Sequence, residues 1–279
     1  MHTDTDLYRR YSIRLIAVLA GLGVATPARA QVGLGLAPMR VELRIASGTQ
    51  RSGSVSVSND SSGPMRVRAQ LLDFFIDSEG TPQFAPAWPT EAGGSCRGWL
   101  TLNPMETELK PGGQAQVRYT LRMPAGTQPG SYNCAAGFTT LPAADAAPGT
   151  GLRMAVRVVA AFYAIAGSPA VDGAVKEIRL EEMHEGDHPG WLGVVVIENR
   201  GSMYFRAAGE LSVLRPDGQV IESMPFQGIP ILPRREQRFL FRFQTQLAPG
   251  PYLLRSRVDI GANEIQETVM PVVVEPRKP

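Results

Sequence analysis

The segment Gln114-Ala115-Gln116-Val117-Arg118-Tyr119-Thr120-Leu121-Arg122-Met123 decides the fold class of this chain. Apolar side chains stand at every second position of this segment, and polar side chains fill the positions between them. A period of two is typical of a β-strand that rests one face on a core. Residues 114–123 therefore predict a half-buried strand.

The same alternation recurs in residues 54–58 and 152–162, and residues 65–76 begin with it. Stretches rich in Gly, Pro, Asn and Asp separate these runs, at 59–64, 77–82 and 110–113. No segment after Gln31 combines a helical period with capping residues. Short strands punctuated by turn residues at this spacing predict an all-β chain built from sandwiches.

A second β unit follows residues 167–173, whose sequence GSPAVDG predicts a linker. The Pro-Gly-Ser-Tyr run at 129–132 has a counterpart, Pro-Gly-Pro-Tyr, at 249–252. Each places a tyrosine at the start of a strand, which resembles the tyrosine corner of immunoglobulin-like sandwiches. We therefore expect two immunoglobulin-like β-sandwich domains in tandem, over residues 31–166 and 174–279.

The N-terminus has the features of a cleaved secretory signal. Arg9, Arg10 and Arg14 precede an uncharged apolar run, and Ala28-Arg29-Ala30 ends it with small residues at the cleavage positions. The uncharged run, residues 15–28, is too short to span a bilayer. Residues 1–30 are thus predicted to be a signal peptide, which places the remaining chain in an oxidising compartment, most simply a bacterial periplasm, without membrane insertion.

Composition excludes several other classes. Of the 279 residues, 43% are hydrophobic and 19% are charged, which is globular rather than disordered composition. The formal net charge of +2 has no concentrated basic block, so a nucleic-acid partner is not expected. In the expected oxidising compartment, the two cysteines of the chain, Cys96 and Cys134, are predicted to pair as a disulfide.

Several motifs, in order, resemble the first domain of PapD-like periplasmic chaperones, which assemble surface fimbriae with an outer-membrane usher. They are Met39-Arg40-Val41, Leu109-Lys110-Pro111-Gly112 with Val117-Arg118, Gly130-Ser131-Tyr132, and a strand that ends in Phe162-Tyr163. The resemblance spans roughly residues 33–166. It implies a chaperone, without catalytic residues or cofactors, that lends a strand to a pilin-like or similar secreted subunit, with an usher as a further partner.

The lent strand would run from about Leu152 to Val158 in this sequence. Four alternate apolar residues would then enter the groove of the subunit: Leu152, Met154, Val156 and Val158. The other interpretation of these four residues is that they fill the protein's own core, because alternation alone is compatible with both.

The resemblance also implies a clamp for the subunit's terminal carboxylate, formed by an arginine and a lysine. Arg40 stands at the arginine position, whereas Ala160 occupies the lysine position, two residues before Phe162. A single arginine can still bind a carboxylate through two hydrogen bonds. The departure leaves open a second hypothesis, a non-catalytic immunoglobulin-like binding or structural protein of the cell envelope.

One motif points to a different class. His184-Glu185-Gly186-Asp187-His188 matches the HExxH pattern of zinc proteases, in which two histidines on one helix face bind the metal. Gly186 within the motif and Pro189 directly after it disfavour a helix there. We therefore expect a polar loop between two strands and no metal site or enzyme activity, and a zinc metalloprotease stays a remote alternative.

Overall fold

The computed structural model describes residues 33–86, 94–141, 155–183 and 190–275. The predicted signal peptide, residues 1–30, lies outside these ranges. Within them the chain is mostly β-strand, and the helical structure is limited to the short 3₁₀ turn η1 (Arg97–Trp99). The prediction of an all-β chain is confirmed.

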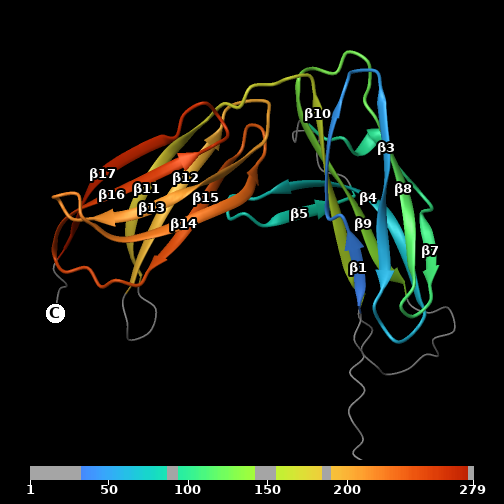
Figure 1. Ribbon diagram of the computed structural model, residues 1–279, viewed down its shortest axis with the longest axis horizontal. Coiled ribbons are helices and arrows are strands. Elements are labelled where there is room, and N and C mark those ends of the chain that lie inside the picture. Colours follow the sequence, from blue (N-terminus) through green and yellow to red (C-terminus); the bar gives the residue numbers. More distant parts are fainter. Residues whose placement is uncertain (1–32, 87–93, 142–154, 184–189, 276–279) are drawn as a thin grey trace, which may run out of the picture. The chain divides into compact units, whose positions relative to one another are not determined.

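Strands β1 to β10 form the first sandwich (Figure 1). One sheet has the order β1-β3-β8-β6, and the other has the order β2-β10-β9-β4-β5, with β7 also paired to β4. The strands of the first sheet are β1 (Leu34–Ala37), β3 (Gln50–Asn59), β8 (Gln114–Arg122) and β6 (Leu100–Asn103). Those of the second are β2 (Arg40–Ile45), β10 (Arg157–Ala166), β9 (Gly130–Leu141), β4 (Met65–Ile76), β5 (Pro82–Ala85) and β7 (Glu106–Leu109).

Strands β11 to β17 form the second sandwich, again from two sheets (Figure 1). The three-stranded sheet consists of β11 (Gly173–Met183), β12 (Gly190–Asn199) and β15 (Glu236–Phe243). The four-stranded sheet has the order β14 (Val220–Ile231), β13 (Phe205–Leu214), β16 (Gly250–Asp259) and β17 (Gln266–Val274). In both sheets of the second sandwich, all neighbouring strands pair in the antiparallel direction.

Each sandwich has a core of its own, made from the inward faces of its strands. In β8 the inward face is the one that the alternation predicts, with Val117 and Leu121 fully buried. In β15 the alternate residues Phe239, Phe241 and Phe243 are buried in the second core. The two immunoglobulin-like sandwiches in tandem are thus a consequence of period-two patterning along both halves of the chain.

Both halves contain the expected tyrosine corner. The Tyr132 hydroxyl donates a hydrogen bond to the carbonyl oxygen of Gln128 at 2.9 Å. The Tyr252 hydroxyl donates to the carbonyl oxygen of Ala248, also at 2.9 Å. In each case the phenol closes the turn that precedes its own strand, so the internal repeat seen in the sequence is a repeat of structure.

We expect removal of either hydroxyl to destabilise the protein modestly. A Tyr132→Phe or Tyr252→Phe substitution keeps the ring and removes one hydrogen bond, which is worth about 1 kcal/mol of unfolding free energy. Urea denaturation measures the change. Tyr119→Phe is the matched control, because no hydrogen bond of its hydroxyl is found in the described residues; equal stability of all three variants and the wild type would contradict the role of the corners.

The two sandwiches also share a hydrogen-bonding arrangement around a buried asparagine, Asn59 in the first and Asn199 in the second. Each accepts a hydrogen bond from the main-chain N–H two residues further on, and its side-chain amide donates hydrogen bonds to main-chain carbonyls. The acceptors are the carbonyls of Gly63, Leu109 and Lys110 for Asn59, and those of Met203 and Ile231 for Asn199. The asparagines therefore tie the end of one strand to the turn after another at matching places in the two sandwiches.

The predicted disulfide is confirmed. Cys96 and Cys134 are bonded, with their Cα atoms 5.1 Å apart, within the range that a disulfide requires. Both cysteines are fully buried. The bond fixes the segment before η1 to β9, the central strand beside β10.

Candidate functional site: the open edge of strand β10

The first half of β10 has an open edge because the N-terminal segment crosses between the two sheets. Residues 34–37 pair with β3 in one sheet, whereas residues 40–45 pair with β10 in the other. The parallel register of β2 with β10 begins at Arg40 opposite Ala161. Residues 157–160 of β10 therefore pair with β9 on one side, and no strand of the described residues pairs with their other side.

The main-chain groups on this open side can be assigned from the neighbouring hydrogen bonds. The N–H of Ala161 donates to the carbonyl oxygen of Met39 at 2.9 Å, on the β2 side. Successive residues of a strand direct their N–H and C=O groups to opposite sides. The N–H and C=O groups of Val159 and Arg157 consequently face the open edge, whereas those of Ala160 and Val158 face β9.

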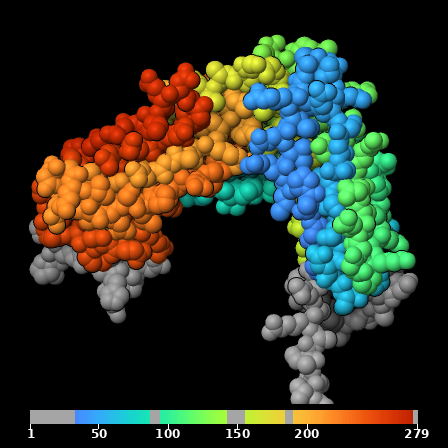
Figure 2. Space-filling view, in the orientation of Figure 1, coloured from blue at the N-terminus to red at the C-terminus, as the bar shows by residue number. Residues whose placement is uncertain are grey.

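The edge strands of the second sandwich carry prolines or charges, which are the usual obstacles to edge pairing. Edge strands β14 and β17 contain Pro225, Pro230 and Pro271, and Figure 2 shows the β17 segment (red) at the surface of the second sandwich. Edge strands β11 and β15 instead carry charged residues along their length. The sequence Val158-Val159-Ala160 contains neither a proline nor a charged residue, so the main chain of this short edge can pair with another strand.

The predicted donor residues are placed as follows. Leu152 and Met154 lie outside the described residues. Val156 and Val158 are half-buried and pack against the core of the first sandwich. The regular strand begins at Arg157. Just before it, the N–H of Val156 donates a hydrogen bond to the Thr140 hydroxyl, and the carbonyl oxygen of Val156 accepts one from the N–H of Thr140, each at 3.0 Å. Val156 and Val158 thus share the inward face of β10 with Phe162.

Arg40 lies on the opposite face of this sheet. Its side chain is exposed and forms an ion pair with Glu42 at 3.3 Å. Ala160, by contrast, is fully buried in the core of the first sandwich. A longer cation at position 160 of this chain would enter the core rather than stand beside Arg40.

Further groups on the face of Arg40 come from β10 and from the second sandwich. Tyr163 is the register partner of Glu42, and its ring lies 4.5 Å from that of Tyr204, centroid to centroid. Burial, together with a hydrogen bond to Glu42, raises the pKa of Tyr204 above its ordinary value. The Arg206 guanidinium lies over the Tyr163 ring at 5.7 Å from its centroid.

These groups give the face a mixed polar and aromatic character that sequence reasoning missed. Burial also raises the pKa of Tyr163, and the nearby Arg206 opposes that shift. Tyr204 and Arg206 come from a part of the chain far from Arg40 in sequence, and no motif spacing connects them. The contacts of the Tyr204 ring and the Arg206 guanidinium with the Tyr163 ring bring these groups together.

The HExxH segment, residues 184–188, lies outside the described residues. It connects β11 to β12, which pair as antiparallel neighbours with Met183 opposite Gly190. The two strands expected around the motif, over residues 175–182 and 191–198, are both present. In the described part of the chain, no group of His, Cys, Asp and Glu side chains has a geometry that could hold a metal ion.

The part of the chain that the structure describes has no helix with the length and hydropathy of a membrane span.

Comparison with known proteins gives structural matches alone. No family model and no curated protein matches the sequence. Among solved structures, the class 5 fimbriae chaperone CfaA is similar at 14% identity, with 88% of this chain and 100% of that chain covered and a TM-score of 0.44. The Pseudomonas aeruginosa CupB2 chaperone is similar at 16% identity, with 86% and 100% covered and a TM-score of 0.40.

A chain of the Salmonella enterica SafA pilin in complex with the SafB chaperone is similar at 16% identity, with 87% of this chain and 96% of that chain covered and a TM-score of 0.39. These three solved structures are a fimbriae chaperone, a chaperone, and a complex of a pilin with a chaperone.

Proposed function

We propose that this protein is a periplasmic chaperone that binds and stabilises fimbrial or similar secreted subunits by donating the β10 edge to them. The observation that carries the proposal is the open edge of residues 157–160, which is free of proline and of an adjacent strand in the described part of the chain. The motifs shared with PapD-like chaperones in residues 33–166 support the same function.

Strand donation has a simple physical basis. A subunit sandwich that lacks one strand exposes unpaired main-chain groups and an apolar groove. The N–H and C=O groups of Val159 and Arg157 would satisfy the main chain of such a subunit. Alternate apolar side chains from the segment that precedes them, Leu152, Met154, Val156 and Val158, would set the register in the groove.

Arg40 is the candidate anchor for a carboxylate of the subunit. Its ion pair with Glu42 must open, or be shared, before the guanidinium can bind another acid. Arg206 is a further cation at this face; its guanidinium lies over the Tyr163 ring and donates a hydrogen bond to the carbonyl oxygen of Gly228 at 2.6 Å. The proposed anchor therefore consists of Arg40 with Arg206 nearby, and position 160 has no part in it.

Location and domain organisation complete the proposal. Residues 1–30 would direct the chain to the periplasm, and residues 31–166 and 174–279 would be the two domains, joined at 167–173. The Cys96–Cys134 disulfide supports an oxidising compartment, because structural disulfides persist there and are rare in the cytosol. The partners would be a pilin-like or secreted subunit and an outer-membrane usher.

The proposal is tested by export of the full chain together with a pilin-like subunit encoded beside its gene, followed by affinity purification of the chaperone. We expect the subunit to co-purify in a one-to-one complex. Absence of a complex with every such subunit would favour the alternative, an envelope-binding protein that has kept the fold without strand donation. The ion pair of Arg40 with Glu42 is the observation that favours this alternative.

Arg40→Ala is expected to reduce co-purified subunit only severalfold. The ion pair of Arg40 is exposed, and exposed pairs contribute about 0–1 kcal/mol, so the melting temperature should hardly change. Arg44→Ala, an exposed arginine further along the same face of β2, is the matched control and should leave capture unchanged. Equal capture by Arg40→Ala and wild type would remove Arg40 from the proposed anchor.

A further inference from the structure

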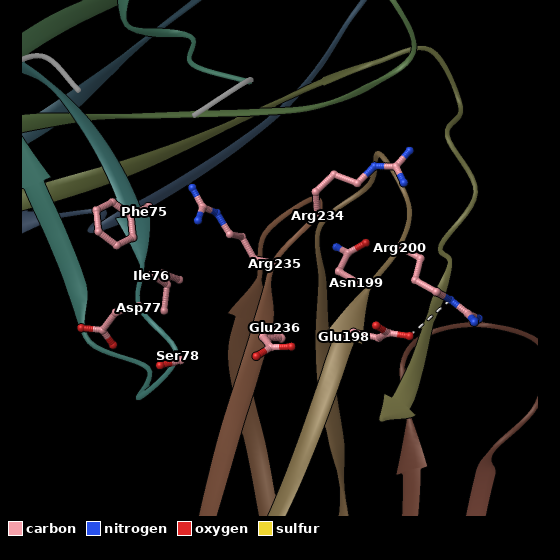
Figure 3. A pocket seen from close by; sticks show the side chains of 10 residues that line it. All are labelled: Phe75, Ile76, Asp77, Ser78, Glu198, Asn199, Arg200, Arg234, Arg235 and Glu236. Carbon is pink, nitrogen blue, oxygen red and sulfur yellow. Dashed lines mark ion pairs between the residues drawn. The ribbon is translucent and has the colours of Figure 1, made fainter. Parts of the chain in front are cut away.

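A hollow of 640 Å³ lies where the turn before β15 approaches the end of β4 (Figure 3). Its lining includes Phe75 and Ile76 from β4 and three arginines, Arg200, Arg234 and Arg235. Figure 3 shows Arg235 directed toward Phe75, whereas Arg234 extends from the same turn in the other direction. None of these residues belongs to the open edge of β10 or to the Arg40 face.

The turn that carries Arg234 repeats a turn of the first sandwich. In residues 110–113 the N–H of Gly113 donates to the carbonyl oxygen of Lys110 at 2.8 Å. In residues 232–235 the N–H of Arg235 donates to the carbonyl oxygen of Leu232 at 3.2 Å. Asn59 and Asn199 hold the two turns in the same way, through their own N–H and their side-chain amides.

The third residue of this repeated turn has a left-handed conformation in both sandwiches. In the first sandwich the residue is Gly112, with φ 67°, and glycine adopts that conformation without steric cost. In the second sandwich the residue is Arg234, with φ 59°. Arg234 is the only residue other than glycine with a positive φ in the described part of the chain. A side chain held in a disfavoured conformation where glycine would serve points to a function for that side chain.

The charges around the hollow leave the guanidinium of Arg234 available. Arg200 forms an ion pair with Asp172 at 3.1 Å, and Arg235 stacks over the Phe75 ring at 5.7 Å. No carboxylate of the described residues pairs with Arg234, which is exposed. The acids of the lining have partners of their own: Asp77 within its turn, Glu236 on Lys176 and Glu198 on Arg200.

We propose that Arg234 and this hollow form a second binding site, for a carboxylate group of an extended peptide segment of a partner protein. A guanidinium with free N–H groups matches a carboxylate through two parallel hydrogen bonds. The lining contains three arginines and three acids, so its charge suits a monoanion better than a phosphate. The half-buried ring of Phe75 adds apolar contact for a peptide, which a free anion would not use. The site does not depend on strand donation by β10.

The test uses the full chain without its signal and three tetrapeptides, too short to offer a groove to β10. The first is acetyl-Ala-Val-Ala-Val with a free C-terminal carboxylate, the second is its amide, and the third is an amide with an internal aspartate. NMR titration follows the amide signals of residues 232–236. We expect the free acid to bind at least tenfold more tightly than the first amide, and the aspartate peptide shows whether a side-chain carboxylate also suffices. Equal binding of all three peptides would overturn the proposal, as would tighter binding of inorganic phosphate.

Three variants separate charge from conformation at this site. Arg234→Gln keeps the strained turn and should lose at least fivefold in affinity for the acid, and Arg234→Lys should retain part of it. Arg234→Gly should lose the same affinity but raise the melting temperature, because glycine relieves the left-handed conformation. Arg215→Gln, an exposed arginine in the turn between β13 and β14, is the control with unchanged affinity. Unchanged affinity in Arg234→Gln would refute the site.

Discussion

Val159→Pro is expected to abolish capture of a subunit while the free protein stays folded. Proline at position 159 removes an N–H group that faces the open edge and adds ring atoms where the incoming strand would lie. No hydrogen bond to β9 is lost, because the main-chain groups of Val159 face away from that strand. Loss of the bond and the steric conflict together should reduce co-purified subunit by at least tenfold.

Ala160→Pro is the matched control for this prediction. The N–H of Ala160 faces β9, so proline there breaks the ladder inside the first sandwich and should lower the melting temperature clearly. Melting temperature and co-purified subunit are measured for both variants. If Val159→Pro captures subunit as well as the wild type does, the open edge is not the active element; if it melts as early as Ala160→Pro, the assignment of the open side is wrong.

Removal of the disulfide is expected to have the largest effect on stability. The Cys96–Cys134 bond closes a loop with a sequence separation of 38, and bonds of this kind contribute about 2–4 kcal/mol by restricting the unfolded chain. The double variant Cys96→Ala/Cys134→Ala should lose unfolding free energy of that size. Urea denaturation under oxidising conditions measures it.

The wild-type protein denatured in the presence of a reductant provides the control for this experiment. It should approach the stability of the double variant, because both lack the same cross-link. A double variant that unfolds at the wild-type urea concentration would show that the loop before η1 is held by its other contacts. Those include the Arg97 Nε to Asp73 ion pair at 3.0 Å.

Most of the fold of this chain can be predicted from the period-two alternation of apolar residues and from the turn residues between the strands. Residues 65–76 form a strand with the predicted bounds, and Val117 and Leu121 face the core as predicted. The tyrosine corners follow from Pro-Gly-x-Tyr, because the turn and the start of the strand are encoded within four residues. Local patterns of this kind are readable because the contacts that they determine are themselves local.

The candidate site is less readable for a physical reason. Residues 158–166 of strand β10 are half-buried or buried on both faces, so alternation in the sequence could not indicate which side chains face the first core and which face outward. That Arg40 and Ala160 lie on opposite faces required the register of β2 with β10. The contacts of Glu42 and Tyr163 with Tyr204 and Arg206 cross from one sandwich to the other, where sequence spacing carries no signal.

The point at which the N-terminal segment crosses from one sheet to the other determines how many residues of the proposed donor strand have an open edge. Residues 34–37 are occupied with β3, and continued parallel pairing would otherwise have placed residues 36–39 against residues 157–160. Moving the crossing toward the N-terminus by one residue would cover one more residue of β10, and moving it the other way would expose one more. The number of β10 residues left open for a partner strand therefore depends on where the chain crosses between β1 and β2, far from β10 in the sequence. This number can change in evolution without any substitution in β10 itself.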